Sequence, residues 1–158
     1  MPNTTSAKTV FVNSHFGPMK ATYVGDVLIN LAFINTDDPV LFSRAASPLT
    51  QWLADYASQK PTLYNGAMKL EGTPFQQAVW AALSAIPYGQ TCSYADIARA
   101  IKRPKAYRAV AQACKHNPIA LIIPCHRVIA HDGQPGGYAG QSHHPLKVAL
   151  LEHEQLRQ

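Results

Sequence analysis

The chain has 158 residues, of which 47% are hydrophobic, with 14 Lys and Arg against 9 Asp and Glu, a formal charge of +5. This length and composition suit one compact globular domain, or a small lobe joined to a larger one, and exclude a low-complexity chain. Three cysteines without paired spacing argue against a disulfide framework and for a reducing compartment. The N-terminal segment is polar and no apolar stretch approaches a membrane span in length, so we expect a soluble, cytoplasmic protein without a membrane partner.

The first third of the chain has the pattern of a small antiparallel sheet followed by a helix. Short runs of β-branched and aromatic residues are separated by turn dipeptides, which is typical of strands with tight connections. The strands are predicted at residues 9–16, 19–24 and 27–34, with turns at Gly17-Pro18 and Gly25-Asp26 and a helix at 45–58. A polar stretch follows, so we expect an N-terminal lobe over residues 1–68 and a C-terminal domain over 69–158.

The C-terminal part is predicted to be mainly helical. Thr73-Pro74-Phe75-Gln76 combines a capping hydroxyl, a proline at the first helical position and a glutamine at the third, and it opens a helix that ends at Pro87. Ser93 can cap a short helix through Ile101, and another is predicted at 106–116. A last helix begins near Pro145.

The two short helices around the basic turn 102–105 resemble a helix-turn-helix. Six Lys and Arg and no acidic residue lie between Arg99 and Lys115, so the positive field is local and suits a polyanion. Small side chains on the second helix would permit close approach to a nucleic-acid groove, with Arg108 as the one long side chain. These small residues are Ala106, Ala109, Ala111 and Ala113. A plain packing unit of two helices is the alternative.

A cysteine and a histidine, Cys125 and His126, follow the apolar run 120–123 and a proline. A thiol becomes a nucleophile when a base or positive charge favours its thiolate, and His126 and Arg127 are candidates for these roles. In extended backbone the two neighbours would point opposite ways and need a bend or a bridging water to interact. A carboxylate would orient the imidazole, and Glu152 and Glu154 are both available. Simple packing of Cys125 and His126 in the core is the competing interpretation.

A metal site is not expected. The seven histidines include one adjacent pair, His143-His144, but no spacing that gives converging ligands, and there is no Cys-x-x-Cys pair. Packing explains Cys92 and Cys114. We therefore predict no metal and no cofactor.

Taken together, these motifs resemble the O6-alkylguanine-DNA alkyltransferase family, the methylated-DNA–protein-cysteine methyltransferases. The resemblance covers residues 72–154, and the Pro-Cys-His-Arg-Val core is highly specific for that family. The motifs that carry it are Gly72-Thr73-Pro74-Phe75-Gln76-Gln77-Ala78-Val79-Trp80, Ser93-Tyr94, Arg108-Ala109-Val110, Asn117-Pro118, Ile123-Pro124-Cys125-His126-Arg127-Val128, Gly137-Tyr138 and Leu150-Leu151-Glu152-His153-Glu154.

The resemblance implies an α+β fold, with a small N-terminal antiparallel sheet lobe of RNase H-like type and a mainly helical C-terminal lobe that contains a winged helix-turn-helix. It also implies a DNA repair protein that binds duplex DNA through the minor groove and rotates an O6-alkylguanine out of the stack. The alkyl group then moves irreversibly to Cys125, and one molecule acts once. Such a protein is expected to be a monomer with no obligate protein partner, associated with the nucleoid when it is bound to DNA.

The resemblance also assigns roles to residues. Cys125 accepts the alkyl group, a water and His126 remove its proton, and Glu154 orients the imidazole, which decides between the two glutamates. Tyr94 polarises the purine, Arg108 fills the gap left by the base, and Asn117 fixes the hinge before the active-site strand. The DNA face further includes Ala106, Ala109 and Ala113, and the base pocket comprises Val128, Tyr138, Ala139 and Lys147.

The chain departs from the family pattern around the recognition helix and the pocket rim. The family often has two glycines where Ala111-Gln112 stand, a serine at Ala139 and a glycine at Gln141, and the stretch 141–145 is slightly longer here. These changes put DNA affinity and tolerance of larger alkyl groups in doubt. No cysteine precedes Cys92, so the zinc site that some relatives carry in the N-terminal lobe is not expected.

Three alternatives stay open. A non-catalytic alkyltransferase-like lesion binder would share the fold but lack a reactive thiol, and Cys125 argues against it. A helix-turn-helix regulator would bind a defined sequence without regard to alkylation. A Cys-His hydrolase would turn over an ester or amide repeatedly.

Overall fold

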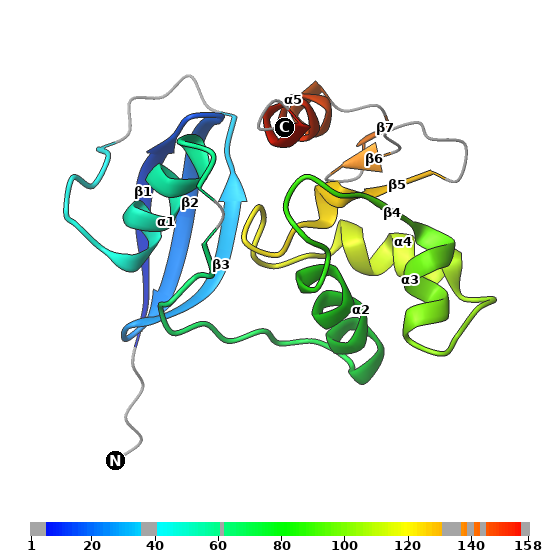
Figure 1. Cartoon of the computed structure of the whole chain (residues 1–158). Helices are drawn as coiled ribbons and strands as arrows, with labels where there is room; N and C mark the ends of the chain where they lie inside the picture. The colour runs from blue at the N-terminus through cyan, green and yellow to red at the C-terminus, as the bar shows by residue number, and fades with distance from the viewer. Residues whose placement is uncertain are drawn as a thin grey trace, which may run out of the picture. The chain divides into compact units, whose positions relative to one another are not determined.

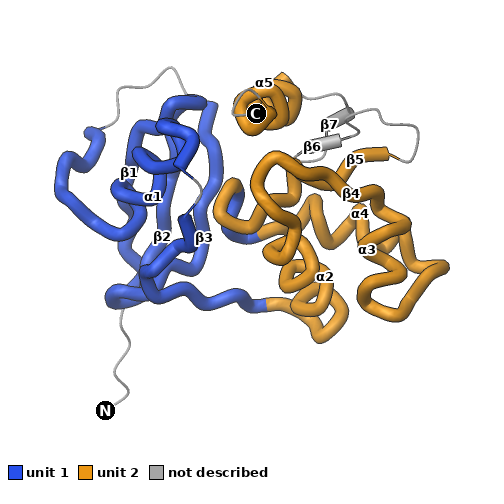
Figure 2. Tube along the Cα trace, in the orientation of Figure 1, with its two compact units in different colours: residues 1–71, 118–120 blue, residues 72–117, 121–158 orange. Residues whose placement is uncertain are grey.

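The computed structural model describes residues 6–35, 41–60, 62–130, 137–138, 141–142 and 145–155. The chain divides into two compact units (Figure 2). Unit 1 comprises residues 1–71 together with 118–120, and unit 2 comprises residues 72–117 and 121–158. A three-residue piece of the C-terminal half therefore folds with the N-terminal unit. Within the described residues, no helix combines the length and the apolar character that crossing a membrane requires.

Unit 1 is built on a three-stranded antiparallel sheet in the order β1-β2-β3 (Figure 1). Residues 118–120 lie along β3, because the Leu31 amide donates to the Pro118 carbonyl and the Ala120 amide donates to the Leu31 carbonyl, both at 2.9 Å. Alternate residues of the strands, such as Met19 and Ala21, are fully buried, as expected for a sheet with one covered face. The elements are β1 (Ala7–Ser14), β2 (Gly17–Val24), β3 (Val27–Phe33) and α1 (Pro48–Ala57).

The first hairpin corrects the predicted turn. Gly17 and Pro18 were expected to form the turn, but they open β2 and pair with Ser14 and Asn13, and the chain reverses at residues 15–16. Gly17 has φ +124°, a value that only glycine adopts without strain, so its place is the closing position of the hairpin. The Ser14 hydroxyl, which donates to the Gly17 carbonyl at 2.7 Å, reinforces the closure.

Helix α1 begins three residues later than predicted, because Ser47 caps it. The Ser47 side chain accepts from the Thr50 amide at 3.1 Å, the Thr50 hydroxyl accepts from the Ser47 amide at 2.9 Å, and Pro48 follows at the first helical position. Its apolar face buries Leu49, Trp52 and other residues in unit 1.

Unit 2 is mainly helical and confirms the predicted α+β class. The capping box Thr73–Gln76 opens α2 as predicted, and Ser93 with Asp96 caps α3 in the same way. The Trp80 indole donates to the Ala113 carbonyl at 2.9 Å and so joins α2 to α4. The elements are α2 (Pro74–Ser84), β4 (Cys92–Ser93), α3 (Tyr94–Ala100), α4 (Tyr107–Lys115), the 3-10 helix η1 (Cys125–Arg127), β5 (Val128–Ile129), β6 (Gly137–Tyr138), β7 (Gln141–Ser142) and α5 (Pro145–Gln155).

Two short strand pairs place the segments around η1. β4 pairs in parallel with β5, through Cys92 with Val128 and Ser93 with Ile129, and so the start of α3 lies beside the end of η1. β6 and β7 form an antiparallel pair. The core of unit 2 contains Val79, Trp80, Leu83, Ile97, Val110, Ile123, Val128 and Leu150, each at most 3% exposed.

Candidate active site

Cys125 lies on a single 3-10 turn rather than in extended backbone. The Arg127 amide donates to the Pro124 carbonyl at 3.0 Å, and this turn supplies the bend that neighbouring Cys125 and His126 would otherwise lack. The apolar run 120–123 before Cys125 is only partly buried. Leu121 and Ile123 are buried, and Ala120 and Ile122 are half-buried. Cys125 is itself buried, with 9% of the residue exposed.

The loop that leads to Cys125 is held by Asn117. Its side-chain amide donates to the Ile123 carbonyl at 2.8 Å, while its backbone amide donates to the Cys114 carbonyl at 3.2 Å. Leu121, between these points, has φ +73°, a left-handed conformation that costs energy for a side chain branched at Cγ and persists only where its surroundings enforce it. Asn117 therefore links the end of α4 to the cysteine loop.

His126 is fully buried and bonded to Glu154 from α5. Its Nε2 lies 2.6 Å from Glu154 Oε2, and both side chains are at most 1% exposed. Among the described residues, the other ring nitrogen, Nδ1, has no hydrogen-bond partner although it is buried. Glu152, the other candidate, is exposed. The Nε2 atom of the imidazole is thus held by a carboxylate, and the Nδ1 atom is available to exchange a proton.

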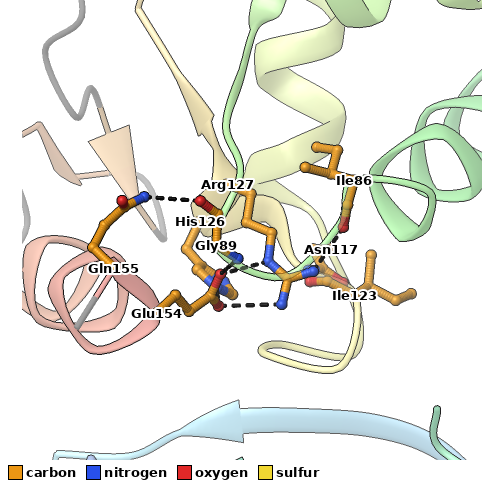
Figure 3. A network of polar contacts seen from close by, with 8 residues as sticks. All are labelled: Ile86, Gly89, Asn117, Ile123, His126, Arg127, Glu154 and Gln155. Carbon is orange, nitrogen blue, oxygen red and sulfur yellow. Dashed lines mark hydrogen bonds and ion pairs between the residues drawn. The ribbon is translucent and has the colours of Figure 1, made fainter. Parts of the chain in front are cut away.

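Glu154 is also the centre of a wider polar network (Figure 3). Arg127 donates to it twice, Nε to Oε1 at 2.8 Å and Nη2 to Oε2 at 3.2 Å, and the Gly89 amide donates to Oε1 at 3.1 Å. The third nitrogen group of Arg127, Nη1, donates to the Ile86 carbonyl at 2.8 Å. The Arg127 guanidinium carbon also lies 5.5 Å from the centroid of the Tyr88 ring.

The arginine network corrects one expectation from the sequence. Arg127 was expected to favour the Cys125 thiolate, but its guanidinium is committed to Glu154 and to the Ile86 carbonyl. The positive charge that lowers the pKa of Cys125 comes instead from Lys147. Adjacency in the sequence was misleading, because successive residues of a 3-10 turn project in different directions.

Burial sets the protonation states at the site. Burial raises the pKa of the Cys125 thiol, although a hydrogen bond from Asn117 and the charge of Lys147 lower it. Burial also lowers the pKa of His126, against the raising effect of Glu154. Burial raises the pKa of Glu154, but its hydrogen bond with His126 and its ion pair with Arg127 outweigh burial, and the pKa falls to about 2. The resting site therefore holds a thiol, a neutral imidazole and a carboxylate.

Lys147 is a second buried charge beside the cysteine. It is fully buried, it donates from Nζ to the Val128 carbonyl at 2.5 Å, and Nζ lies 5.7 Å from the Tyr94 ring centroid. Burial lowers its pKa to about 8, while the thiols of Cys125 and Cys114 raise it. Burial first, and then the two thiols, raise the pKa of Tyr94 to about 12. Tyr94 is therefore a neutral hydrogen-bond donor near Lys147, Cys125 and Cys114.

The predicted DNA-facing residues divide between surface and interior. Arg108 and Ala109 are exposed on the first turn of α4, and Ala106 is half-buried at its N-cap. Ala113 is 3% exposed and its carbonyl accepts from the Trp80 indole, so it lies in the core of unit 2, and its role as a DNA contact stays a prediction. The second half of α4 packs on α2.

Two predicted pocket residues cannot be placed. The Tyr138 backbone belongs to β6, but its side chain lies outside the described part of the molecule, as does all of Ala139. Among the described residues, no three His, Cys, Asp or Glu side chains converge as metal ligands would.

Sequence reasoning missed the residues that hold Glu154 and its partner Arg127. Ile86, Tyr88 and Gly89 lie in the turn after α2, far from Cys125 in the sequence, and two of them contribute through the backbone. Backbone donors and acceptors carry no side-chain signal. The one clue in the sequence was Arg127. It directly follows two residues that are expected to be buried, and an arginine in such a place needs a partner for its guanidinium.

The sequence model described as "6-O-methylguanine DNA methyltransferase, DNA binding domain" matches residues 74–156. The methylated-DNA–protein-cysteine methyltransferase of Mycobacterium tuberculosis is 42% identical over 156 residues, which cover 92% of this chain and 91% of that protein. The constitutive protein of that name from Bacillus subtilis is 46% identical over 106 residues, 67% of this chain and 64% of that protein. The crystal structure of Mycobacterium tuberculosis OGT in complex with DNA has a TM-score of 0.81 at 40% identity, covering 94% of this chain and 93% of that chain.

The fold and site thus define a DNA repair protein that acts through an acceptor cysteine. The chain belongs to the methylated-DNA–protein-cysteine methyltransferase family. Chemically, the arrangement offers a thiol, a neutral base held by a carboxylate, and a buried cation beside the sulfur, which together suit a single alkyl transfer to sulfur.

Proposed function

We propose that this chain repairs O6-alkylguanine in duplex DNA by accepting the alkyl group on the sulfur of Cys125. In this step the S–C bond forms, the bond between the alkyl carbon and guanine O6 breaks, and the thiol proton ultimately neutralises the departing guanine. A thioether is not a leaving group, so each molecule acts once and no cofactor takes part. The observation that carries the proposal is the buried His126, next to Cys125: its Nε2 is fixed by Glu154, and its Nδ1 has no hydrogen-bond partner among the residues that the structure describes.

The proton path would run from Cys125 through a water to His126 Nδ1, with Glu154 stabilising the imidazolium. A neutral His126 can accept this proton, and the ionised Glu154 at 2.6 Å compensates the charge that forms. Lys147 stabilises the thiolate from another direction. The raised pKa of Cys125 keeps the thiol protonated until the substrate is bound, and so protects it from other electrophiles.

Base eversion would be the task of Arg108 and Tyr94. A base stacked inside a duplex cannot reach the sulfur of Cys125, so the nucleotide has to be everted. Eversion costs a few kcal/mol, and a side chain that fills the gap left by the base lowers this cost. Arg108 is exposed on the first turn of α4 and is long enough to fill that gap. Tyr94 would polarise the purine by donating a hydrogen bond, since its pKa of about 12 makes it a poor proton source but a stable donor.

The everted guanine would be read by the region around Val128 and Lys147. The Val128 carbonyl already accepts from Lys147, which orients it, and its second lone pair remains suited to the guanine amino group. We place Tyr138 and Ala139 at the pocket rim by family resemblance, Ala106 and Ala109 on the DNA face, and Asn117 at the hinge that presents Cys125.

The division of labour would follow the predicted domains. Residues 69–158 would bind DNA and accept the alkyl group, and residues 1–68 would form the N-terminal lobe. The partner is duplex DNA containing O6-alkylguanine, as the crystal structure of the Mycobacterium tuberculosis relative with DNA suggests. We further propose that the chain acts as a monomer in the cytoplasm, at the nucleoid when it is bound to DNA.

Intact mass measurement after incubation with an O6-methylguanine duplex separates this function from the alternatives. The proposal predicts one added methylene mass per molecule, absent in Cys125→Ala, which still binds DNA. A lesion binder or a sequence-specific regulator would gain no mass, and a hydrolase would show repeated turnover of an ester or amide. Loss of DNA binding in Cys125→Ala would mean that the thiol is structural.

A further inference from the structure

Tyr107 is a large aromatic side chain that the fold leaves in solvent. It is the first residue of α4, it is 47% exposed, and it is the one strongly exposed large hydrophobic residue in the described part of unit 2. It stands directly before Arg108, whose guanidinium carbon lies 6.0 Å from the centroid of the Tyr107 ring. The N-cap residue, Ala106, makes no side-chain cap hydrogen bond.

The surroundings of Tyr107 are basic. The turn before it is exposed and carries Lys102, Arg103 and Lys105, and the next residue after Arg108 on α4 is the exposed Ala109. An aromatic ring interleaved with positive charges and small residues is the composition of a surface that binds nucleic acid through phosphates and stacking. A contact with one exposed guanidinium covers little of the ring, so a further apolar partner would be favourable.

We propose that Tyr107 is a second DNA-inserting residue, whose ring packs in the minor groove against the base step beside the gap that Arg108 fills. The inference rests on the proposed function, since it requires Arg108 at the everted nucleotide. Because Tyr107 and Arg108 are consecutive on a helix, their side chains diverge by about 100° around the axis, so they cannot occupy the same gap. Arg108 would replace the missing base while Tyr107 supports its neighbour, as apolar wedges do in other minor-groove proteins.

The test compares Tyr107→Ala and Tyr107→Phe with the unsubstituted chain in single-turnover methyl transfer. Two substrates are used, an O6-methylguanine duplex and the free base O6-methylguanine, which needs no contact with α4. Tyr107→Ala should lower the duplex rate about 5- to 100-fold, the range for one lost aromatic stack, and leave the free-base rate unchanged. Tyr107→Phe keeps the ring and should remain within about twofold on both substrates. The salt dependence of duplex binding should not change, because no phosphate contact is removed.

A cycle with Arg108→Ala separates a direct contact from support of the arginine. If the ring contacts DNA itself, Tyr107→Ala lowers the duplex rate in the Arg108→Ala background as well. The inference is overturned if Tyr107→Ala has no effect on the duplex rate, if its effect vanishes in the Arg108→Ala background, or if the free-base rate falls equally. Failure of the proposed function looks different, because the unsubstituted chain would then transfer no methyl group from either substrate.

Discussion

Unit 2 contains two groups of charged residues that are built in opposite ways. We call the buried group of Cys125, His126, Arg127, Lys147 and Glu154 the acceptor network, and the exposed segment 102–109 the recognition surface. In the acceptor network each described charge faces a specific partner at 2.5–3.2 Å, and the side chains are at most 11% exposed. On the recognition surface the charges stand in solvent.

The difference teaches what each region can do. Buried charges act strongly at short range and hold fixed protonation states, which an alkyl transfer requires, but removing one partner leaves the other uncompensated. Exposed charges contribute little to folding and are free to bind phosphates. Substitutions in the acceptor network should therefore alter chemistry and stability together, whereas substitutions on the recognition surface should alter the handling of DNA alone.

The largest effect is expected from Glu154→Gln. The amide cannot stabilise an imidazolium at His126, so methyl transfer from the free base should slow by about 10²-fold or more, the usual contribution of general base catalysis. The pKa of Cys125, followed by thiol alkylation across pH, should rise further. The matched control is Glu152→Gln on the same helix, which is exposed and should behave as the unsubstituted chain. An unchanged alkylation profile in Glu154→Gln would refute the relay.

Arg127→Met should cost about 2–3 kcal/mol of unfolding free energy, because it leaves the buried Glu154 without its bidentate partner. The pKa of Glu154, now about 2, should rise. A carboxylate with a lowered pKa stabilises the fold above its ordinary pKa of 4.5, and this contribution is lost as the pH falls toward 2. The difference in unfolding free energy between the unsubstituted chain and Arg127→Met should therefore narrow as the pH falls.

The control for Arg127→Met is Arg99→Met. Arg99 pairs with Asp96 on α3, but the two side chains are 61% and 48% exposed. Loss of this pair should change the unfolding free energy by less than about 1 kcal/mol. Chemical denaturation of both variants at neutral pH checks the comparison, and equal losses would mean that burial does not distinguish the two arginines.

Arg108→Ala should slow methyl transfer from duplex DNA by about 10- to 50-fold, since the cost of eversion is a few kcal/mol and the arginine offsets part of it. Transfer from the free base and the unfolding free energy should stay the same, because Arg108 is exposed. A fluorescent base analogue beside the lesion reports eversion directly. A parallel loss with the free base would place Arg108 in the chemistry rather than in DNA handling.

The smallest effect concerns Lys147→Met and appears as a pH dependence. Burial lowers the pKa of Lys147 from 10.5 to about 8, so the folded chain binds fewer protons than the unfolded chain between these values. The stability contributed by this residue is therefore full above 10.5 and is lost as the pH falls through about 8. Relative to Lys147→Met, the unsubstituted chain should therefore gain stability as the pH rises from about 8 to 10.5. A constant difference across this window would show that folding does not lower the pKa of Lys147.

The sequence predicted the local elements well where capping and periodicity are explicit. Thr73-Pro74-Phe75-Gln76 opens α2 through the expected capping box, and Ser93 caps α3. Gly17 shows the limit of such reasoning, because a glycine with positive φ can close a hairpin from within a strand as well as form its turn. Local patterns indicate the residues near which the chain reverses, but not the residue at which the pairing of the two strands begins.

For the site, the sequence identified the residues with distinctive chemistry but not the residues that support them. The family resemblance chose Glu154, whose carboxylate lies 2.6 Å from His126. The contribution of Gly89 is a backbone amide, and the pairing of Lys147 with the Val128 carbonyl depends on burial. Neither is visible without coordinates. Ala113, which its small size led us to place on the DNA face, is buried, and its carbonyl accepts a hydrogen bond from the Trp80 indole.

The central claim is that the sulfur of Cys125, and not the neighbouring thiol of Cys114, receives the alkyl group. Cys114 is the natural comparison, because it is buried beside Cys125 with a pKa of about 12. Peptide mapping by mass spectrometry after one exposure to an O6-methylguanine duplex measures this directly. We expect one methyl group per molecule on the peptide that contains Cys125, retained in Cys114→Ser. A methyl group on Cys114, or an unlabelled Cys125 after the lesion has disappeared, would contradict the account.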